Sequence, residues 1–479
     1  NTWHAICFKT ESLRSETDYV RILPLGLPCL IGTHREKKTR HSITSLLGRE
    51  VSSRGPANSL YLGPKLCVII ITVDSVKRDL IQALQLVGEL QIHLDVVTIP
   101  SDEDWGTAES LRHIQDKIKT DVLVVSCDLI TDVDLQLLAD VHRTYDASVT
   151  VLMHTAPDQS TEGAVPGTKS KRKHEQRDIV GLDEKGQRLL LLAAEADIEE
   201  ALTVRKSVLK RYPFIQVKTR LLDAHMYILK KWVMDFLVDD KVGSSYSTIK
   251  GELIPYLVKK QFSRPKTSLM NSQPDSMEPE RPAEDKDTDI SSYGGVDELT
   301  RTARAMSSWN EHMGEMSDYF QHEDVLRCHT YIMDGGFCVR ANTMAAYCEA
   351  NRQITQQKQV LGDDQLIHPT ATIKSKSQVG QESMLGDGTT VGERVSIKRS
   401  IIGKHCIVGD KVKIINSVIM DHVNISDGCV IQGSVICGNT HIGESVEMKD
   451  CLVGSSQNVA PKVKYSCEVI GDTARMMEI

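Results

Sequence analysis

Residues 400–436 read SIIGKHCIVGDKVKIINSVIMDHVNISDGCVIQGSVI. A Ser followed by two aliphatic residues begins at positions 400, 417 and 434, and Cys451-Leu452-Val453 continues the series, so the motif returns every seventeen residues. Within each period an aliphatic residue or Met recurs at steps of six, six and five. Sixteen such positions run along the C-terminal region: Ile367, Ile373, Val379, Leu385, Val391, Ile397, Ile402, Val408, Ile414, Ile419, Ile425, Ile431, Ile436, Ile442, Met448 and Val453.

This spacing is a hexapeptide repeat, the signature of a parallel β-helix. A coil of three short strands needs one inward aliphatic residue per strand and corners that tolerate Gly. Gly follows the apolar residue at seven places: Gly380, Gly386, Gly392, Gly403, Gly409, Gly443 and Gly454. We expect about five coils, with Ile402, Ile419, Ile436 and Val453 stacked in the core. Unrelated strands with chance periodicity are the alternative, but all sixteen positions are apolar in a chain that is 40% hydrophobic.

Length and composition limit the function classes. At 479 residues the chain exceeds a single core, which predicts two or three domains. Its net charge of −8 argues against direct nucleic-acid binding, and we interpret the basic run 169–173 as a solvated loop rather than a targeting or RNA-contacting patch. The twelve cysteines form no C-x-x-C pair, so we expect reduced thiols and a cytosolic protein. Apolar runs such as residues 67–73 are too short to cross a bilayer, and we expect no membrane partner.

The region between residues 67 and 153 alternates strand and helix patterns. Strand-length apolar runs occupy residues 67–73, 94–99, 121–125 and 147–153. One helix opens at Gly106-Thr107, and a capping box from Thr131 to Asp134 is expected to begin another. This alternation is typical of βαβ units and predicts a mostly parallel sheet with helices on both faces. We expect the same sheet to continue through residues 178–183, 186–192 and 217–229.

These patterns predict a five-part organisation of the chain. We interpret residues 1–60, which have no clear periodicity, as an atypical N-terminal segment that is incomplete or misjoined. Residues 61–262 are expected to form the α/β domain. Residues 263–326, rich in Pro and charge, are expected to be a largely disordered linker. Residues 327–360 would bridge, by a strand and a helix, to the β-helix and tail at 361–479.

Two candidate ligand positions lie where strands of an open α/β sheet end, which is the usual ligand edge of such sheets. Gly106-Thr107 opens a helix, whose N–H groups and dipole favour a phosphate; an ordinary helix start is the alternative. Asp128 follows a buried strand, where a carboxylate suits Mg²⁺ beside a nucleotide; a turn-forming or helix-capping Asp is the alternative. A nucleotide site also needs a Gly-rich loop with a basic residue, and none is recognisable. We therefore predict no catalytic residue, no metal ligand set and no cofactor.

Five segments of the chain resemble known proteins. They read VVSCDLITD at 124–132, DAHMY at 223–227, ELIPYLVKKQ at 252–261, EANRQ at 349–353 and IQGSVIC at 431–437. An α/β domain followed by a repeat domain is similar to the nucleoside-diphosphate-sugar pyrophosphorylases and to two initiation-factor subunits. The five segments most closely resemble the family of gamma subunits of eukaryotic translation initiation factor 2B, from about residue 67 to the C-terminus.

The resemblance implies a nucleotidyltransferase-like α/β domain and a left-handed β-helix. It also implies a noncatalytic structural and regulatory subunit of a guanine-nucleotide exchange complex, whose partners are the epsilon subunit, the other subunits and initiation factor 2. Gly106, Thr107 and Asp128 would then be a vestigial nucleotide or metal site. Two features depart from the pattern: Cys127 stands before Asp128 where pyrophosphorylases have Gly, and residues 1–60 lack a recognisable Gly-rich loop.

Two other functions stay open on the sequence. The chain would be an active sugar-nucleotide pyrophosphorylase if Asp128 held Mg²⁺ and Gly106-Thr107 lay near the nucleotide. That reaction depends on clamping and neutralising a triphosphate, which is the task of the missing loop. Alternatively, the fold would bind a nucleotide or a sugar phosphate as a sensor, without turnover.

Overall fold

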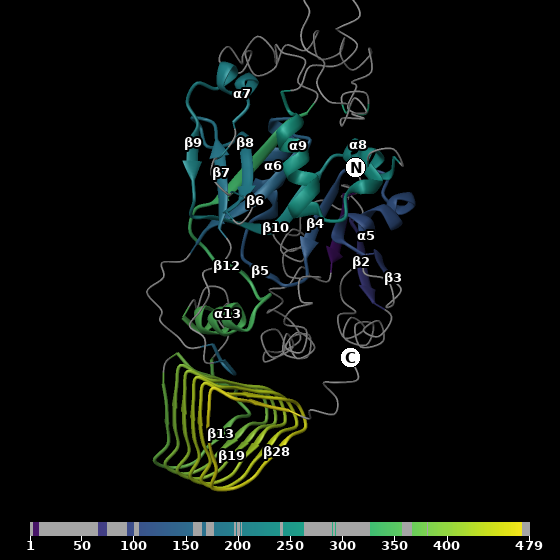
Figure 1. The fold of residues 1–479 in the computed structure, drawn as a ribbon. Coiled ribbons are helices and arrows are strands. Elements are labelled where there is room, and N and C mark those ends of the chain that lie inside the picture. Colours follow the sequence, from purple (N-terminus) through teal and green to yellow (C-terminus); the bar gives the residue numbers. More distant parts are fainter. Residues whose placement is uncertain are drawn as a thin grey trace, which may run out of the picture.

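The computed structural model describes residues 3–8, 66–73, 93–99, 105–156, 165–168, 177–195, 198, 202, 204–239, 243–262, 290, 293, 326–356, 366–380 and 382–471. An α/β part precedes a parallel β-helix, and helix α13 (Met344–Gln356) lies between them (Figure 1). This is the predicted fold class. Among the described residues, no helix is long and apolar enough to span a membrane.

The α/β part is built on a seven-stranded sheet with the order β11-β6-β10-β4-β1-β2-β3. Its strands are β1 (Trp3–Phe8), β2 (Leu66–Val73), β3 (His93–Ile99), β4 (Val122–Ser126), β6 (Val149–Thr155), β10 (Leu221–Leu229) and β11 (Cys328–Met333). Neighbouring strands are parallel except β10, which is antiparallel to both β4 and β6. The prediction of a mostly parallel sheet is therefore confirmed.

Strand β1 was not predicted, yet it lies inside the sheet. It pairs in parallel with β2 on one side and with β4 on the other. Its six residues, WHAICF, are apolar apart from His4, and so short an apolar run does not by itself distinguish a buried strand from a segment of a buried helix. Two strands of this sheet, β1 and β11, thus come from outside residues 61–262, the range that the sequence analysis assigned to the α/β domain.

A second, three-stranded sheet corrects the expected course of the chain. Antiparallel strands β7 (Asp178–Leu182), β8 (Leu189–Ala194) and β9 (Gln216–Lys218) form it in the order β8-β7-β9. The pattern of residues 217–229 predicted one strand in a single continuous sheet. Instead, the chain bends at residues 219–220, so β9 joins β7 while β10 returns to the main sheet.

Among its described residues, the α/β part contains eight helical elements. They are α5 (Thr107–His113), η1 (Gln115–Lys117), α6 (Leu135–Thr144), α7 (Lys206–Arg211), α8 (Lys231–Val238), η3 (Gly243–Ser245), η4 (Ile249–Leu253) and α9 (Ile254–Lys260). Helix α6 begins three residues later than a box that starts at Thr131 predicts, because its N-cap is Asp134, which accepts from the Gln136 N–H at 2.9 Å. Thr131 belongs instead to β5 (Leu129–Thr131).

The region predicted as a disordered linker, 263–326, lies outside the described residues except at Ile290, Tyr293 and Leu326. Ile290 is 8% exposed and belongs to the core of the α/β part. The Tyr293 ring meets Phe236 edge to face, and its hydroxyl donates to Asp239. At these positions the chain packs on the domain rather than leaving it.

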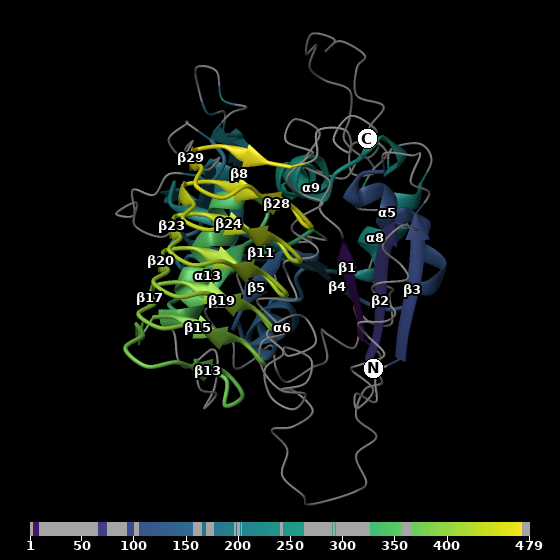
Figure 2. The same ribbon diagram turned by 90° about the horizontal axis from the view of Figure 1, so that it is seen from below.

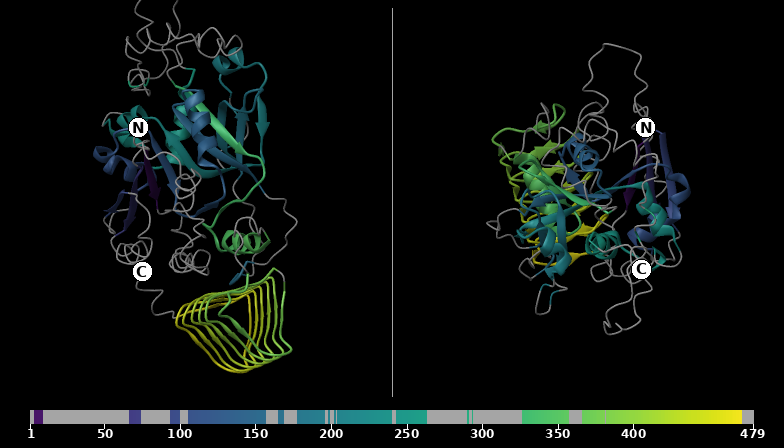
Figure 3. Two further views of the ribbon diagram at one scale, coloured as in Figure 1. Left: turned by 180° about the vertical axis from the view of Figure 1, so that it is seen from behind. Right: turned by 90° about the horizontal axis from the view of Figure 1, so that it is seen from above.

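The β-helix has six strands on each of three sides, and its outline is triangular (Figure 3). The β13 sheet contains β13 (Thr372–Ile373), β16 (Thr390–Val391), β19 (Ile407–Val408), β22 (Asn424–Ile425), β25 (His441–Ile442) and β28 (Asn458–Val459). The β14 sheet contains β14 (Gln378–Val379), β17 (Ser396–Lys398), β20 (Lys413–Ile415), β23 (Val430–Gln432), β26 (Glu447–Lys449) and β29 (Lys464–Ser466). The β15 sheet contains β15 (Met384–Leu385), β18 (Ile401–Ile402), β21 (Val418–Ile419), β24 (Val435–Ile436), β27 (Leu452–Val453) and β30 (Val469–Ile470). Figure 2 shows successive coils stacked along the axis.

Inward side chains of successive coils lie directly above one another. Ile402, Ile419, Ile436 and Val453 are paired in register along the β15 sheet, and each is 0% exposed. Six coils are present rather than about five, because strands β28, β29 and β30 extend the repeat beyond Val453. Ile373, expected inside, is 37% exposed, because its strand is the first of its sheet and is covered on one side only.

The Ser that begins each motif has a structural reason. The Ser417 N–H donates to Ser400 Oγ at 3.1 Å, and the Ser434 N–H donates to Ser417 Oγ at 3.2 Å. The Cys451 N–H continues this ladder by donating to Ser434 Oγ at 3.1 Å. Each of these buried corner N–H groups thus has a partner seventeen residues earlier, which avoids the cost of an unpaired buried donor.

The three outer faces of the β-helix differ in polarity. On the β15 sheet the outward residues are apolar and buried, in one cluster with Phe337 and with residues of α13 such as Tyr347: Met384, Ile401, Val418, Val435 and Leu452. On the β13 sheet they are exposed and uncharged: Thr372, Thr390, Ile407, Asn424, His441 and Asn458. The β14 sheet carries exposed charge at Lys398, Lys413, Glu447, Lys449 and Lys464. Helix α13 therefore joins the two parts of the molecule through one side of the triangle only.

Candidate functional site

Asp128 lies just beyond the C-terminal end of β4, where the chain turns into β5. It is 5% exposed. Strand β5 pairs antiparallel with β12 (Cys338–Arg340), which places Arg340 opposite Leu129 and next to Asp128. The Arg340 Nη2 donates to Asp128 Oδ2 at 2.8 Å, and the Ser126 hydroxyl donates to Oδ1. The carboxylate at the end of β4 is thus neutralised by a guanidinium of the same chain.

His225 reaches the same guanidinium from β10. The register of β10 against β6 shifts between Asp223 and Tyr227, and His225 lies within this shift with a left-handed φ of 53°. Its Nε2 lies 2.8 Å from Arg340 Nη1. Burial, and then the charges of Arg340 and Lys250, lowers the pKa of His225 to about 2. The ring is therefore neutral, and Nε2 accepts a hydrogen bond from the guanidinium.

A second buried carboxyl, Asp223, has different neighbours. It accepts from the His225 N–H at 2.7 Å and from the Tyr227 hydroxyl at 2.8 Å. Burial raises the pKa of Asp223, and the charge of Lys250, which is ion-paired with Asp178 at 2.9 Å, opposes this rise. Asp128 thus faces a full positive charge, whereas the hydrogen bonds to Asp223 come from neutral donors.

The predicted phosphate position at Gly106-Thr107 is engaged within the chain. The Gly106 N–H donates to Glu109 Oε2 at 2.6 Å, and the Ala108 N–H donates to the Ser247 carbonyl at 2.8 Å. Thr107 Oγ1 accepts from the Ile249 N–H at 2.9 Å. A Cβ at Gly106 would lie 2.1 Å from the Ser247 carbonyl oxygen, so the close approach of this segment requires Gly. Two N–H groups that a phosphate would use at this helix start already have partners.

These contacts limit what the arrangement does chemically. A divalent cation at Asp128 would have to displace Arg340, because both seek the same carboxylate oxygens. Among the described residues, no group of three or more His, Cys, Asp or Glu side chains is placed to hold a metal ion. Asp128, Arg340, Ser126 and His225, together called the polar centre below, therefore form an internal ion pair with hydrogen-bonded neighbours.

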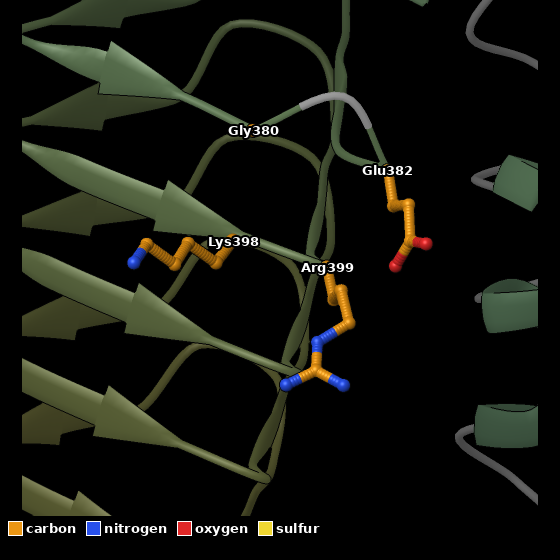
Figure 4. A pocket seen from close by; sticks show the side chains of 4 residues that line it. All are labelled: Gly380, Glu382, Lys398 and Arg399. Atoms are coloured by element: carbon orange, nitrogen blue, oxygen red, sulfur yellow. The ribbon is translucent and has the colours of Figure 1, made fainter.

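A shallow depression on the β-helix offers no better site. Gly380, Glu382, Lys398 and Arg399 line it, and it is open to solvent (Figure 4). Glu382 and Arg399 extend from the corner toward one side, while Lys398 points away. Both cationic side chains are exposed. Such a surface cannot exclude water, which makes it unsuited to group transfer.

Comparison of the whole chain with known proteins identifies its family. The chain is 30% identical over 349 residues to the translation initiation factor eIF2B subunit gamma of Dictyostelium discoideum, with 70% of this chain and 74% of that relative aligned. The chain belongs to the family of eIF2B gamma subunits. The gamma subunit of Schizosaccharomyces pombe is 28% identical over 311 residues, which cover 65% of this chain and 58% of that protein. The gamma subunit of Caenorhabditis elegans is 29% identical over 214 residues, which cover 42% and 51% respectively.

The β-helix gives a separate match within the same factor. Residues 350–465 match the family described as the EIF2B subunit epsilon LbH domain. The matched range begins inside α13 and extends to β29, so it covers almost all of the coils. The resemblance to eIF2B gamma subunits that five segments predicted is confirmed by the 30% identity over 349 residues, and the β-helix matches a domain of eIF2B type.

Sequence reasoning selected Asp128 but missed the residues around it in this eIF2B gamma family member. Arg340 lies 212 positions further along the chain, so no local spacing connects the two. One signal was present: Arg340 is a charged residue at the end of an otherwise apolar strand, directly after Cys338 and Val339. His225 and Asp223 were part of a segment that was quoted for its resemblance and not assigned a role.

Proposed function

We propose that this chain is a noncatalytic structural and regulatory subunit of the eIF2B guanine-nucleotide exchange complex. It would support GDP/GTP exchange on initiation factor 2 during translation initiation in the cytosol, with the epsilon subunit and the other subunits as partners. The observation that carries the proposal is the 30% identity over 349 residues to an eIF2B gamma subunit. The role requires no cofactor of the chain's own.

The surroundings of Asp128 support the noncatalytic part of the proposal. Nucleotidyl transfer needs a metal ion and cations that clamp the triphosphate. Arg340 instead neutralises Asp128 from within the chain. The first turn at Gly106 and Thr107 is bonded to residues 247–249. We infer that Gly106, Thr107 and Asp128 are a vestigial nucleotide or metal site that now serves packing.

The polarity of the β-helix supports a role in assembly. The apolar β15 sheet is buried by α13 inside this chain, so it is not available to another subunit. The outward residues of the β13 and β14 sheets are mostly exposed. A partner subunit that binds a side of the β-helix would contact the outer face of the β13 sheet or of the β14 sheet.

Co-purification tests the assembly role. The chain is co-expressed with a tagged epsilon subunit of the same organism, and we expect both to elute together at a fixed ratio. Two matched outward substitutions then identify the surface that contacts epsilon: Asn424→Arg on the β13 sheet and Gln432→Arg on the β14 sheet. The contacting surface is the one whose substitution reduces the amount of chain that elutes with epsilon. A well-folded wild-type chain that never elutes with epsilon contradicts the proposal.

A pyrophosphate assay tests the absence of catalysis. The purified chain is incubated with nucleoside triphosphates, sugar 1-phosphates and Mg²⁺, and we expect pyrophosphate release at the rate of the enzyme-free control. Release well above that control which disappears in Asp128→Ala would show an active nucleotidyltransferase and overturn the noncatalytic assignment.

A further inference from the structure

The α7–β9 segment, residues 204–220, concentrates exposed apolar side chains. Large hydrophobic side chains that are substantially exposed number seven among the described residues, and three of them lie within nine positions of this segment. Phe214 is 72% exposed, Val217 is 54% exposed and Leu209 is 47% exposed. Phe214 is the most exposed of the seven. Single exposed hydrophobic residues are ordinary on a protein surface, but three on one segment of seventeen residues indicate an interaction surface.

The segment also contains a sheet edge. Strand β9 pairs with β7 on one side, and in the part of the chain that the structure describes no strand pairs with its other side. An outer edge presents main-chain N–H and C=O groups to a further strand. Val217, which faces Gly181 in the β7 register, is exposed on this edge strand.

The charge of the segment is one-sided. Residues 204–220 contain six Lys or Arg and no Asp or Glu, in a chain whose net charge is −8. Lys206 and Lys210 are exposed on α7, and Lys218 is half-buried at the end of β9. Figure 1 shows α7 and β9 at the end of the molecule away from the β-helix. The surface is therefore separate from the faces discussed for assembly through the coils.

We propose that the α7–β9 segment binds an extended acidic segment of a partner protein, which adds as a strand to the outer edge of β9. Main-chain hydrogen bonds to β9 supply the register, aliphatic side chains of the ligand cover Val217 and Phe214, and its carboxylates face Lys210 and Lys218. The inference goes beyond the proposed function and does not depend on which subunits the β-helix meets.

An extended peptide fits this surface better than RNA. Single-stranded nucleic acid needs a series of aromatic platforms along a basic groove. Phe214 is the one exposed aromatic ring that the segment offers, because Tyr212 meets Phe262 edge to face. A strand edge, in contrast, is read by main-chain groups, which a nucleic acid does not supply in this register.

Fluorescence anisotropy with three labelled peptides tests the proposal on the full chain. The probe is an octapeptide of alternating Val and Glu. A Val–Lys octapeptide tests charge, and a Val–Glu octapeptide with N-methylated alternate amides tests main-chain pairing. We expect binding of the first probe only, weakened at least tenfold by Phe214→Ser and by Lys210→Glu. Leu137→Ser is the matched control, because Leu137 is 48% exposed on α6, and it should leave the affinity unchanged.

Four outcomes would overturn the proposal. They are no binding of the Val–Glu probe, equal binding of the Val–Lys probe, undiminished binding of the N-methylated probe, and loss of affinity in Leu137→Ser as large as in Phe214→Ser. Tighter binding of a labelled twelve-nucleotide uridine RNA, with the same sensitivity to Lys210→Glu, would assign the surface to nucleic acid. Concentration-dependent self-association that Phe214→Ser abolishes, without peptide binding, would assign it to a second copy of the chain.

Discussion

The β-helix and the polar centre of the α/β part bury their residues by opposite means. In the β-helix, from Leu385 onward, each inward position is filled by an apolar side chain that meets its equivalent seventeen residues away. In the polar centre, Asp128 is paired with Arg340, 212 positions along the chain, and Arg340 in turn donates to His225 from a third strand. One core is local and repeated, whereas the other is long-range and unique.

This difference predicts different responses to substitution. An inward side chain of the β-helix has apolar neighbours in every direction and no partner for a charge. A charged substitution is therefore the change that lowers stability most at such a position. The polar centre already contains charge, so its stability depends on keeping both partners of a pair. Four measurements of the free energy of unfolding test this difference, and they are given in order of decreasing expected effect.

The largest effect is expected for Ile419→Asp in the β-helix. Ile419 is 0% exposed, and the substitution buries an unpaired carboxylate between two coils. We expect a loss of at least about 4 kcal/mol in the free energy of unfolding, measured by urea denaturation. Ile407→Asp is the control, because Ile407 points outward from the same β-helix and is 54% exposed; its cost should stay below about 0.5 kcal/mol. Equal costs would mean that the inward face is wrongly assigned.

The junction of the two parts is expected to come next. Tyr347 on α13 is 0% exposed and packs on the outward residues of the β15 sheet. Tyr347→Ala removes a buried ring, and we expect a cost of about 3–4 kcal/mol from the resulting cavity. Tyr347→Phe preserves the ring and should cost far less in the same denaturation series. If the alanine variant unfolds like wild type, α13 does not hold the β-helix.

The ion pair of the polar centre should show a partner-dependent cost. Asp128→Ala leaves Arg340 with a nearly buried charge and no carboxylate, and we expect a loss of about 3 kcal/mol. Replacing both residues by Leu should cost less than the single change, because no charge is then left unpaired. A double variant as unstable as the sum of its single variants would mean that the two side chains act independently.

The smallest effect concerns pH. Burial, the main cause, lowers the pKa of His142 to about 3, while the ordinary value is 6.5. Between these values the unfolded chain binds a proton that the folded chain does not, so stability present above pH 6.5 is lost as the pH falls. This contribution is about 1.4 kcal/mol per pH unit. His142→Gln should therefore reduce the loss in the free energy of unfolding between pH 7.5 and 5.5 by about 1.4 kcal/mol. If this free energy depends on pH in the same way in the variant and in wild type, burial does not hold His142 in its neutral form.

The predictability of the chain follows the same contrast. The β-helix was readable because each coil repeats one local rule, and the burial of Ile402, Ile419 and Ile436 needs only neighbours of the same kind. The exception, Ile373, occurs where the repeat has an end and one neighbour is absent. A periodic pattern specifies the interior of a stack, but it does not specify how the stack begins.

The α/β part was readable only in its strongly apolar strands. Strand β1 is an apolar run of only six residues, which is ambiguous by itself, and its place in the sheet is set by pairing with β2 and β4. The bend that separates β9 from β10 is likewise set by two different pairing partners. For the candidate site, Asp128 was recognisable from its place after a strand, but Arg340 was not, because tertiary pairing of β5 with β12 brings it there.

Helix α13 changes how the β-helix unfolds. In a plain stack of coils, each coil senses only the coils next to it, so opening proceeds from an end, one coil at a time. The cluster around α13 contains outward residues of five successive coils, from Met384 to Leu452. Loss of any one of these coils therefore disturbs a helix that all five share, which couples them into one cooperative unit. The sixth coil, whose outward Val469 is 36% exposed, lies outside this cluster, so we expect it to open before the other five.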